Sequence, residues 1–195
     1  MNKLALAVVL LVALGAGAST IFLDQQQQEA LTTIDSVPSK TLYDSLPNPL
    51  TQNDLEGVAS DGSASPAFRL RAIHALSSYC AVTPPAACPD NDPAHLTLVG
   101  LITANGSAQT GADLLILRGA VEAIGPMRVQ TDLDALTAML NHPSRDIRAT
   151  AALALGALCN SNATSALHQR YGNESTDQVK LAISAALRML PCPVN

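Results

Sequence analysis

The fold is decided by residues 140–159, LNHPSRDIRATAALALGALC. Pro143 interrupts the start of this stretch, because proline lacks an amide hydrogen and restricts the residue before it. The residues that follow are mostly small and aliphatic, so a helix formed by them packs closely on its neighbours but needs further copies to fill a core. Its apolar residues recur with the 3.6-residue period of a helix, at Ile147, Ala151, Ala154, Leu155 and Leu158.

Three other segments of the chain repeat this pattern. In each copy an aliphatic residue directly follows an alanine. Another apolar residue stands eight positions before that aliphatic residue. Successive copies are 48, 31 and 32 residues apart, and the long first interval contains the stretch between Cys80 and Cys88. Self-similarity at a nearly fixed period predicts a solenoid of stacked helix pairs. The four aliphatic reference residues are Leu76, Ile124, Leu155 and Leu187.

Each repeat also contains a predicted first helix. The second of these opens at Asp92-Pro93, an aspartate N-cap followed by proline at the first helical position. Thr131 is expected to cap the third, and Gly172-Asn173 ends the fourth. We predict no strand. The predicted first helices cover residues 54–59, 92–102, 132–140 and 163–171.

Residues 140–158 resemble a repeat of the HEAT family, with its turn, its apolar–arginine pair at Ile147-Arg148 and an alanine-rich second helix containing Leu-Gly. The resemblance extends over about residues 54–191. It implies an all-α, right-handed α-solenoid of about four HEAT-like helix pairs. The flexible acidic N-terminal segment that we predict before it lies outside the resemblance. In this family the second helices line one face, usually the concave face that binds partners. The resemblance implies no reaction.

The N-terminal part of the chain divides into two predicted segments. Residues 1–18 have the layout of a secretory signal peptide, with Lys3, an apolar run and a small-residue triplet before Ser19. An uncleaved membrane anchor is the alternative, because residues 4–23 are uncharged and long enough to cross a bilayer. Residues 19–50 read as an acidic, low-complexity linker, mostly extended or mobile, in which the glutamines 25–28 could begin a short helix. The repeat domain is predicted to span residues 51–195, and the protein to be periplasmic or extracellular.

The charge of the chain argues against nucleic acid as a partner. The formal net charge is −5. The excess of acid is concentrated before residue 65, and the repeat region is close to neutral. Binding to phosphates requires a positive field that neither part supplies.

The four cysteines are predicted to form disulfides, as is usual in exported proteins. Cys80 and Cys88 enclose a short proline-rich loop. Cys159 and Cys192 end consecutive second helices of the repeat register, which lie side by side in such a stack, so these two should pair. Metal binding is the weaker alternative, because no pair has the spacing of a zinc knuckle.

We find no catalytic motif, and we expect no enzyme activity, no metal and no cofactor. The histidines His74, His95, His142 and His168 lie in different elements and are interpreted as ordinary surface or turn residues. Arg69, Arg148 and Lys180 recur at one repeat position. We interpret them as structural, pairing with a turn carboxylate such as Asp146 or Asp177, although a basic ladder along a binding face is the alternative. The candidate partner-binding residues are polar positions on the second helices: Arg71, His74, Arg118, Glu122 and Arg188.

The sequence therefore predicts an exported interaction or scaffold module whose partner is a protein, with membrane contact only if residues 1–18 are retained. The alternative function is the handling of a small ligand or chromophore, because some proteins with similar repeats are phycobilin lyases. A third hypothesis makes the acidic segment the functional part and the solenoid its support.

Overall fold

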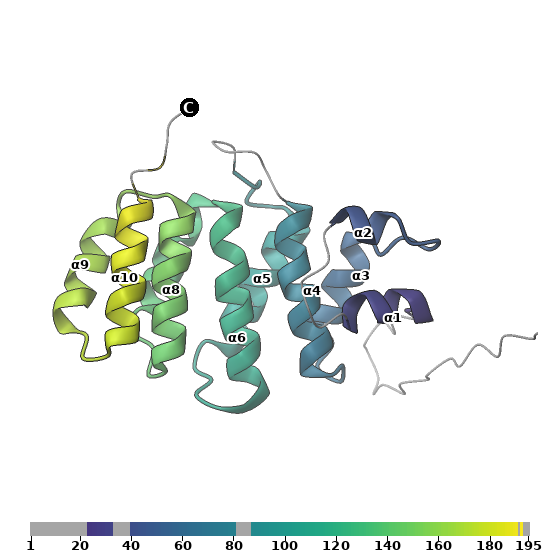
Figure 1. Ribbon diagram of the computed structural model, residues 1–195, viewed down its shortest axis with the longest axis horizontal. Helices are drawn as coiled ribbons and strands as arrows, with labels where there is room; N and C mark the ends of the chain where they lie inside the picture. Colours follow the sequence, from purple (N-terminus) through teal and green to yellow (C-terminus); the bar gives the residue numbers. More distant parts are fainter. Residues whose placement is uncertain (1–22, 33–39, 81–86, 191, 193–195) are drawn as a thin grey trace, which may run out of the picture.

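The computed structural model describes residues 23–32, 40–80, 87–190 and 192, so the predicted signal peptide lies outside it (Figure 1). Within these residues every element is helical, which confirms the predicted all-α class. Helices α3 to α10 form four consecutive pairs. The first helices are α3 (Gln52–Ser60), α5 (Pro93–Asn105), α7 (Leu133–Met139) and α9 (Ala163–Asn173), and the second helices are α4 (Pro66–Tyr79), α6 (Gly111–Ile124), α8 (Arg145–Leu158) and α10 (Asp177–Met189).

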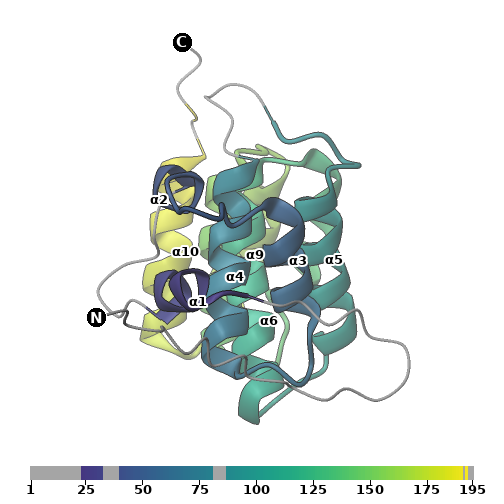
Figure 2. The ribbon, with the colours of Figure 1, turned by 90° about the vertical axis from the view of Figure 1, so that its right-hand side faces the viewer.

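The pairs stack into two layers. The second helices stand side by side in the front layer of Figure 1, where α4 packs on α6, α6 on α8 and α8 on α10. Each second helix also packs on its own first helix, and the first helices form the other layer (Figure 2). One continuous core fills the space between the layers, with a fully buried aliphatic residue from every second helix: Ile73, Leu117, Leu155 and Ile183. This arrangement confirms the predicted helical solenoid.

Glycines set the spacing of the second-helix layer. A Cβ atom at Gly156 would lie 2.9 Å from the Cα atom of Ala186, and one at Gly125 would lie 2.7 Å from the Cα atom of Ala154. The backbones of α8 and α10 therefore meet at Gly156, and the end of α6 meets the backbone of α8 at Gly125. Between α4 and α6 the close contact is with a side chain, since a Cβ at Gly119 would lie 2.8 Å from Cδ2 of Leu70. The glycines of the first-helix layer differ, since a Cβ at Gly100 in α5 or Gly172 in α9 would have nothing within 4 Å.

The caps of the first helices were predicted in part. The carboxylate of Asp92 accepts the Ala94 N–H at 2.9 Å, and Pro93 is the first helical residue, as expected. The cap predicted at Thr131 is wrong. A 3-10 turn, η2 (Gln130–Asp132), precedes α7, so the Thr131 hydroxyl is free to donate to the carboxylate of Asp90 at 3.3 Å instead.

The described part of residues 19–50 is more ordered than we expected. It forms α1 (Gln25–Thr32) and α2 (Lys40–Asp44), which pack on α4 at the end of the stack. Leu31, Tyr43 and Leu50 are buried there because the outer side of the first repeat has no preceding repeat to cover it. Within the described residues, no helix has both the length and the apolar character needed to span a membrane.

Both predicted cysteine pairs lie at disulfide distance. The Cα atoms of Cys80 and Cys88 are 5.6 Å apart, and those of Cys159 and Cys192 are 5.9 Å apart. The first pair closes the segment between α4 and α5. The second joins the end of α8 to the chain that follows α10, which fits the repeat register.

Candidate functional site

The five candidate partner-binding residues all lie on second helices. Arg118 and Glu122 are exposed on α6 and Arg188 is exposed on α10, while Arg71 and His74 on α4 are half-buried. Arg71 lies near Tyr43 of α2: burial raises the pKa of Tyr43 to about 12, and the charge of Arg71 acts in the opposite direction. The structure therefore spreads the candidates over three helices, with Arg71 at the end that α1 and α2 cover.

Exposed apolar side chains accompany these polar residues. Of the seven large apolar side chains that are exposed in the described part of the chain, four lie on second helices, and Leu181 is the most exposed at 70%. Leu153 stands two residues before its reference aliphatic, at the repeat position that His74 and Glu122 occupy in their helices. The second-helix face thus carries a different side chain in each repeat at this position. The four exposed apolar residues are Leu115, Leu153, Leu181 and Met189.

The repeated basic residues connect three of the four second helices to their own first helix or to the turn that follows it. The Arg69 side chain donates to the carbonyl of Ala59 at the end of α3, at 3.0 Å. Arg148 donates to the carbonyl of Pro143 at 2.8 Å, and the Lys180 ammonium lies 5.9 Å from the centroid of the Tyr171 ring. These contacts favour the structural interpretation of the basic position, although of the three residues only Arg148 forms an ion pair with a carboxylate among the described residues.

The partner predicted for Arg148 is wrong. Its guanidinium makes a bidentate pair with Glu174, at 2.8 and 3.0 Å, rather than with Asp146 or Asp177. Arg170 also donates to Glu174, at 2.6 Å. The Glu174 side chain is fully buried, and the hydrogen bond from Arg148 is the largest cause that holds its pKa far below the usual range. Glu174 follows α9 directly, and this position brings it to the start of α8.

A second buried polar group lies between the first helices α5 and α7. The His95 Nε2 atom lies 2.9 and 3.1 Å from the two carboxylate oxygens of Asp132, and both side chains are about 95% buried. The His95 Nδ1 atom lies 2.9 Å from the carbonyl of Asp90, which can only accept, so Nδ1 carries a hydrogen. Burial raises the pKa of Asp132, and the hydrogen bond from His95 opposes this shift.

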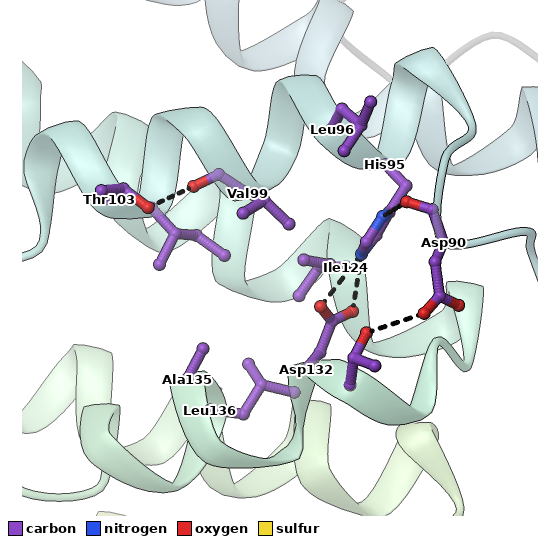
Figure 3. Close-up of a pocket in the computed structure, with 11 residues that line it drawn as sticks. Asp90, His95, Leu96, Val99, Thr103, Ile124, Asp132, Ala135 and Leu136 are labelled. Carbon is purple, nitrogen blue, oxygen red and sulfur yellow. Dashed lines mark hydrogen bonds and ion pairs between the residues drawn. The ribbon is translucent and has the colours of Figure 1, made fainter.

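A pocket of about 320 Å³ adjoins this pair (Figure 3). Its walls are apolar and come from α5, α6 and α7. The His95–Asp132 pair and Asp90 form one end of the pocket. Thr131 also lines the pocket, and its hydroxyl donates to Asp90. The large apolar residues that line the pocket include Leu96, Val99, Ile124 and Leu136.

The interpretation of the histidines as surface or turn residues is wrong for His95 and holds only in part for His142. His168 is exposed, and His74 is half-buried. His142 lies in the turn between α7 and α8 but is buried, and its Nδ1 atom accepts the Ser144 N–H at 3.0 Å. One signal could have revealed the His95–Asp132 pair: both residues lie at the start of consecutive first helices, which come together when repeats stack.

The acidic and sulfur groups near α5 offer one further cluster. Side-chain atoms of Cys80, Cys88 and Asp92 lie within 4.8 Å of one another. Both sulfurs are joined in the disulfide and the Asp92 carboxylate caps α5, so these atoms already have structural roles.

Comparison with known proteins supports the repeat assignment. A family model described as HEAT repeats matches residues 108–188, which span α6 to α10. No curated protein matches the chain. HEAT repeats suggest a role in protein interaction or scaffolding, and the family is generally non-catalytic. Residues 108–188 therefore match HEAT repeats, and the helices of the described residues pack as a helical solenoid that is consistent with this match.

Proposed function

We propose that this chain is an exported HEAT-repeat protein that binds a partner protein through its second-helix face and has no catalytic activity of its own. The exposure of Leu115, Leu153, Leu181 and Met189 on that face is the observation that carries the proposal. Exposed apolar side chains among polar ones are typical of interaction surfaces. Arg118, Glu122 and Arg188 lie among them and would determine which partner fits.

Two independent features support export. Residues 1–18 have the pattern of a signal peptide, and two cysteine pairs lie at disulfide distance, which is typical of proteins from oxidising compartments. The intact mass of the protein from its native source tests this part. A mass that retains the hydrogens of free thiols would contradict export, whereas a mass that includes residues 1–18 would indicate the uncleaved anchor instead of a cleaved signal peptide.

The interaction is tested with matched double variants. Leu115→Ser/Leu153→Ser changes two second-helix residues that are 46% and 43% exposed, and Leu42→Ser/Tyr171→Ser changes two residues elsewhere that are each 43% exposed. Crosslinking in the native envelope identifies the protein captured by the unaltered chain. We expect the first variant to bind it roughly tenfold more weakly and the second to bind it normally. Equal binding by both variants would place the interface elsewhere.

A further inference from the structure

The pocket between α5 and α7 has an apolar body and an acidic end. Leu96, Val99 and Leu136 form its walls, and Leu96 remains 53% exposed beside the opening. The carboxylates of Asp90 and Asp132 lie together at one end (Figure 3). This combination suits a group that is aliphatic along its length and positively charged at its tip.

The hydrogen bonds at the acidic end leave room for another donor. Among the described residues, the Asp132 carboxylate accepts hydrogen bonds from His95 alone, although a carboxylate has about four acceptor sites. The side chain of Asp90 is exposed and accepts one hydrogen bond, from the Thr131 hydroxyl. The carboxylates of Asp90 and Asp132 therefore retain acceptor sites for a hydrogen-bond donor that enters the pocket.

The charge at this end is negative. His95 and Asp132 together are neutral, whether the proton between them is on the imidazole or on the carboxyl group. Asp90 adds a negative charge, and the described residues that line the pocket include no lysine or arginine. The complementary occupant is a cation.

The size and position of the pocket indicate that the cation belongs to a side chain of a polypeptide. A volume of about 320 Å³ is at the lower limit of small-molecule sites, roughly 300–1,000 Å³, and holds one or two side chains. The exposed residues Leu96, Thr103 and Ala135 line it, so a polypeptide lying over α5 and α7 could insert a side chain from above.

We propose that this pocket binds a lysine side chain of a partner polypeptide, with the stem against Leu96, Val99 and Leu136 and the ammonium group at Asp90 and Asp132. The lysine stem covers the apolar walls, while its charged end is paired. The pocket lies in the first-helix layer, so the proposal does not depend on the second-helix face.

The test uses three pentapeptides that differ only at the central residue, Ac-Ala-Ala-X-Ala-Ala-NH2, where X is lysine, norleucine or glutamate. Each is titrated into the full, oxidised protein, and binding is followed by the NMR amide shifts of α5 and α7. We expect lysine to bind most tightly and glutamate most weakly, with lysine exceeding norleucine by roughly two- to fivefold, as for a partly exposed ion pair. Free n-pentylamine should bind more weakly than the lysine peptide.

Two variants assign the contacts. Asp90→Asn should remove the preference for lysine over norleucine, because this substitution removes only the negative charge. The matched variant Asp134→Asn changes an exposed acid of α7 that does not line the pocket, so the preference for lysine should remain. Leu96→Ser should weaken both peptides. Equal binding of glutamate and lysine, no shifts in α5 and α7, or a lysine preference that survives Asp90→Asn would overturn the proposal. Free n-pentylamine binding as tightly as the lysine peptide would overturn the polypeptide as its occupant.

Discussion

In the second-helix layer, Gly156 lies against Ala186, and the backbones of α8 and α10 meet there; in the first-helix layer, α5 and α7 leave a pocket between them. The same repeat unit therefore produces two different contacts. Small residues hold the second helices together by close apolar packing. The first helices α5 and α7 are connected at their ends by the buried His95–Asp132 pair, and Arg148 of the second helix α8 pairs with Glu174 at the end of the first helix α9.

This difference shows how one layer can be rigid while the other has openings. Backbone contact leaves no space for a bound group beside Gly125 and Gly156, so the proposed partner would bind on the outer surface of the second helices. Wider spacing of the first helices permits a pocket, but the buried polar groups that bridge this layer must keep their partners to avoid a large desolvation cost. The following changes test the contrast.

Arg148→Met should have the largest effect. The variant leaves the fully buried Glu174 with Arg170 as its remaining ionic partner among the described residues. It also removes the hydrogen bonds to the carbonyls of His142 and Pro143 in the turn between α7 and α8, so we expect a loss of about 3–5 kcal/mol in unfolding free energy. Urea unfolding measures this. The matched variant Arg145→Met, whose side chain is 66% exposed, should change stability by less than about 0.5 kcal/mol. Similar losses of unfolding free energy in the two variants would mean that the buried Arg148–Glu174 pair contributes little to stability.

Removal of the Cys159–Cys192 pair by serine substitution should cost about 3.5–4 kcal/mol in the chain-entropy model, because the sequence separation is 33 residues. Removal of the Cys80–Cys88 pair, with a separation of 8, should cost about 2.5 kcal/mol. Thermal unfolding of both double variants under identical conditions compares the two. The reverse order would show that native-state contacts, rather than loop length, determine the contribution of each pair.

Gly156→Ala and Gly100→Ala compare the layers directly. The added methyl group at Gly156 meets the backbone of α10, so we expect a loss of about 1–3 kcal/mol. At Gly100 it meets open space in the middle of α5, so we expect a gain of about 0.5–1 kcal/mol from helix propensity. Opposite signs in chemical unfolding would support the contrast, and equal signs would contradict it.

Acidification should weaken the turn that contains His142. Burial lowers the pKa of His142, and Nδ1 can accept the Ser144 N–H only when it is unprotonated. Because the folded-state pKa lies below the usual value of 6.5, the stabilisation is complete above that pH and is lost as pH falls from 6.5 through the lowered pKa. His142→Asn should reduce the slope of stability against pH in this window, whereas His168→Asn, at an exposed site, should not. Urea midpoints measured across the window distinguish the two.

The parts predicted from the sequence are those that depend on the repeat. The alanine–leucine pairs place the second helices, and the same register brings Cys159 beside Cys192. Asp92-Pro93 marks a helix start because the capping chemistry is local. Each of these inferences uses neighbouring residues or equivalent positions in successive repeats.

The parts that were missed depend on contacts between elements. His95 and Asp132 are 37 residues apart, and neither has an unusual sequence neighbourhood. Glu174 was not predicted as the partner of Arg148, because Asp146 lies closer to Arg148 in the sequence. Asp177 likewise lies close to Lys180, the equivalent residue of the last repeat. Leu31, Tyr43 and Leu50 are scattered through a polar segment, and only the uncovered side of α4 explains their burial.

The pairing of Cys159 with Cys192 closes the last helix pair into a covalent ring. A protease that cuts one peptide bond between these residues would therefore release no fragment. The nicked chain would migrate as one species until the disulfide is reduced, and α9 and α10 would stay attached to α8 throughout. The C-terminal end of the solenoid is thus built to survive a single cleavage without dissociating.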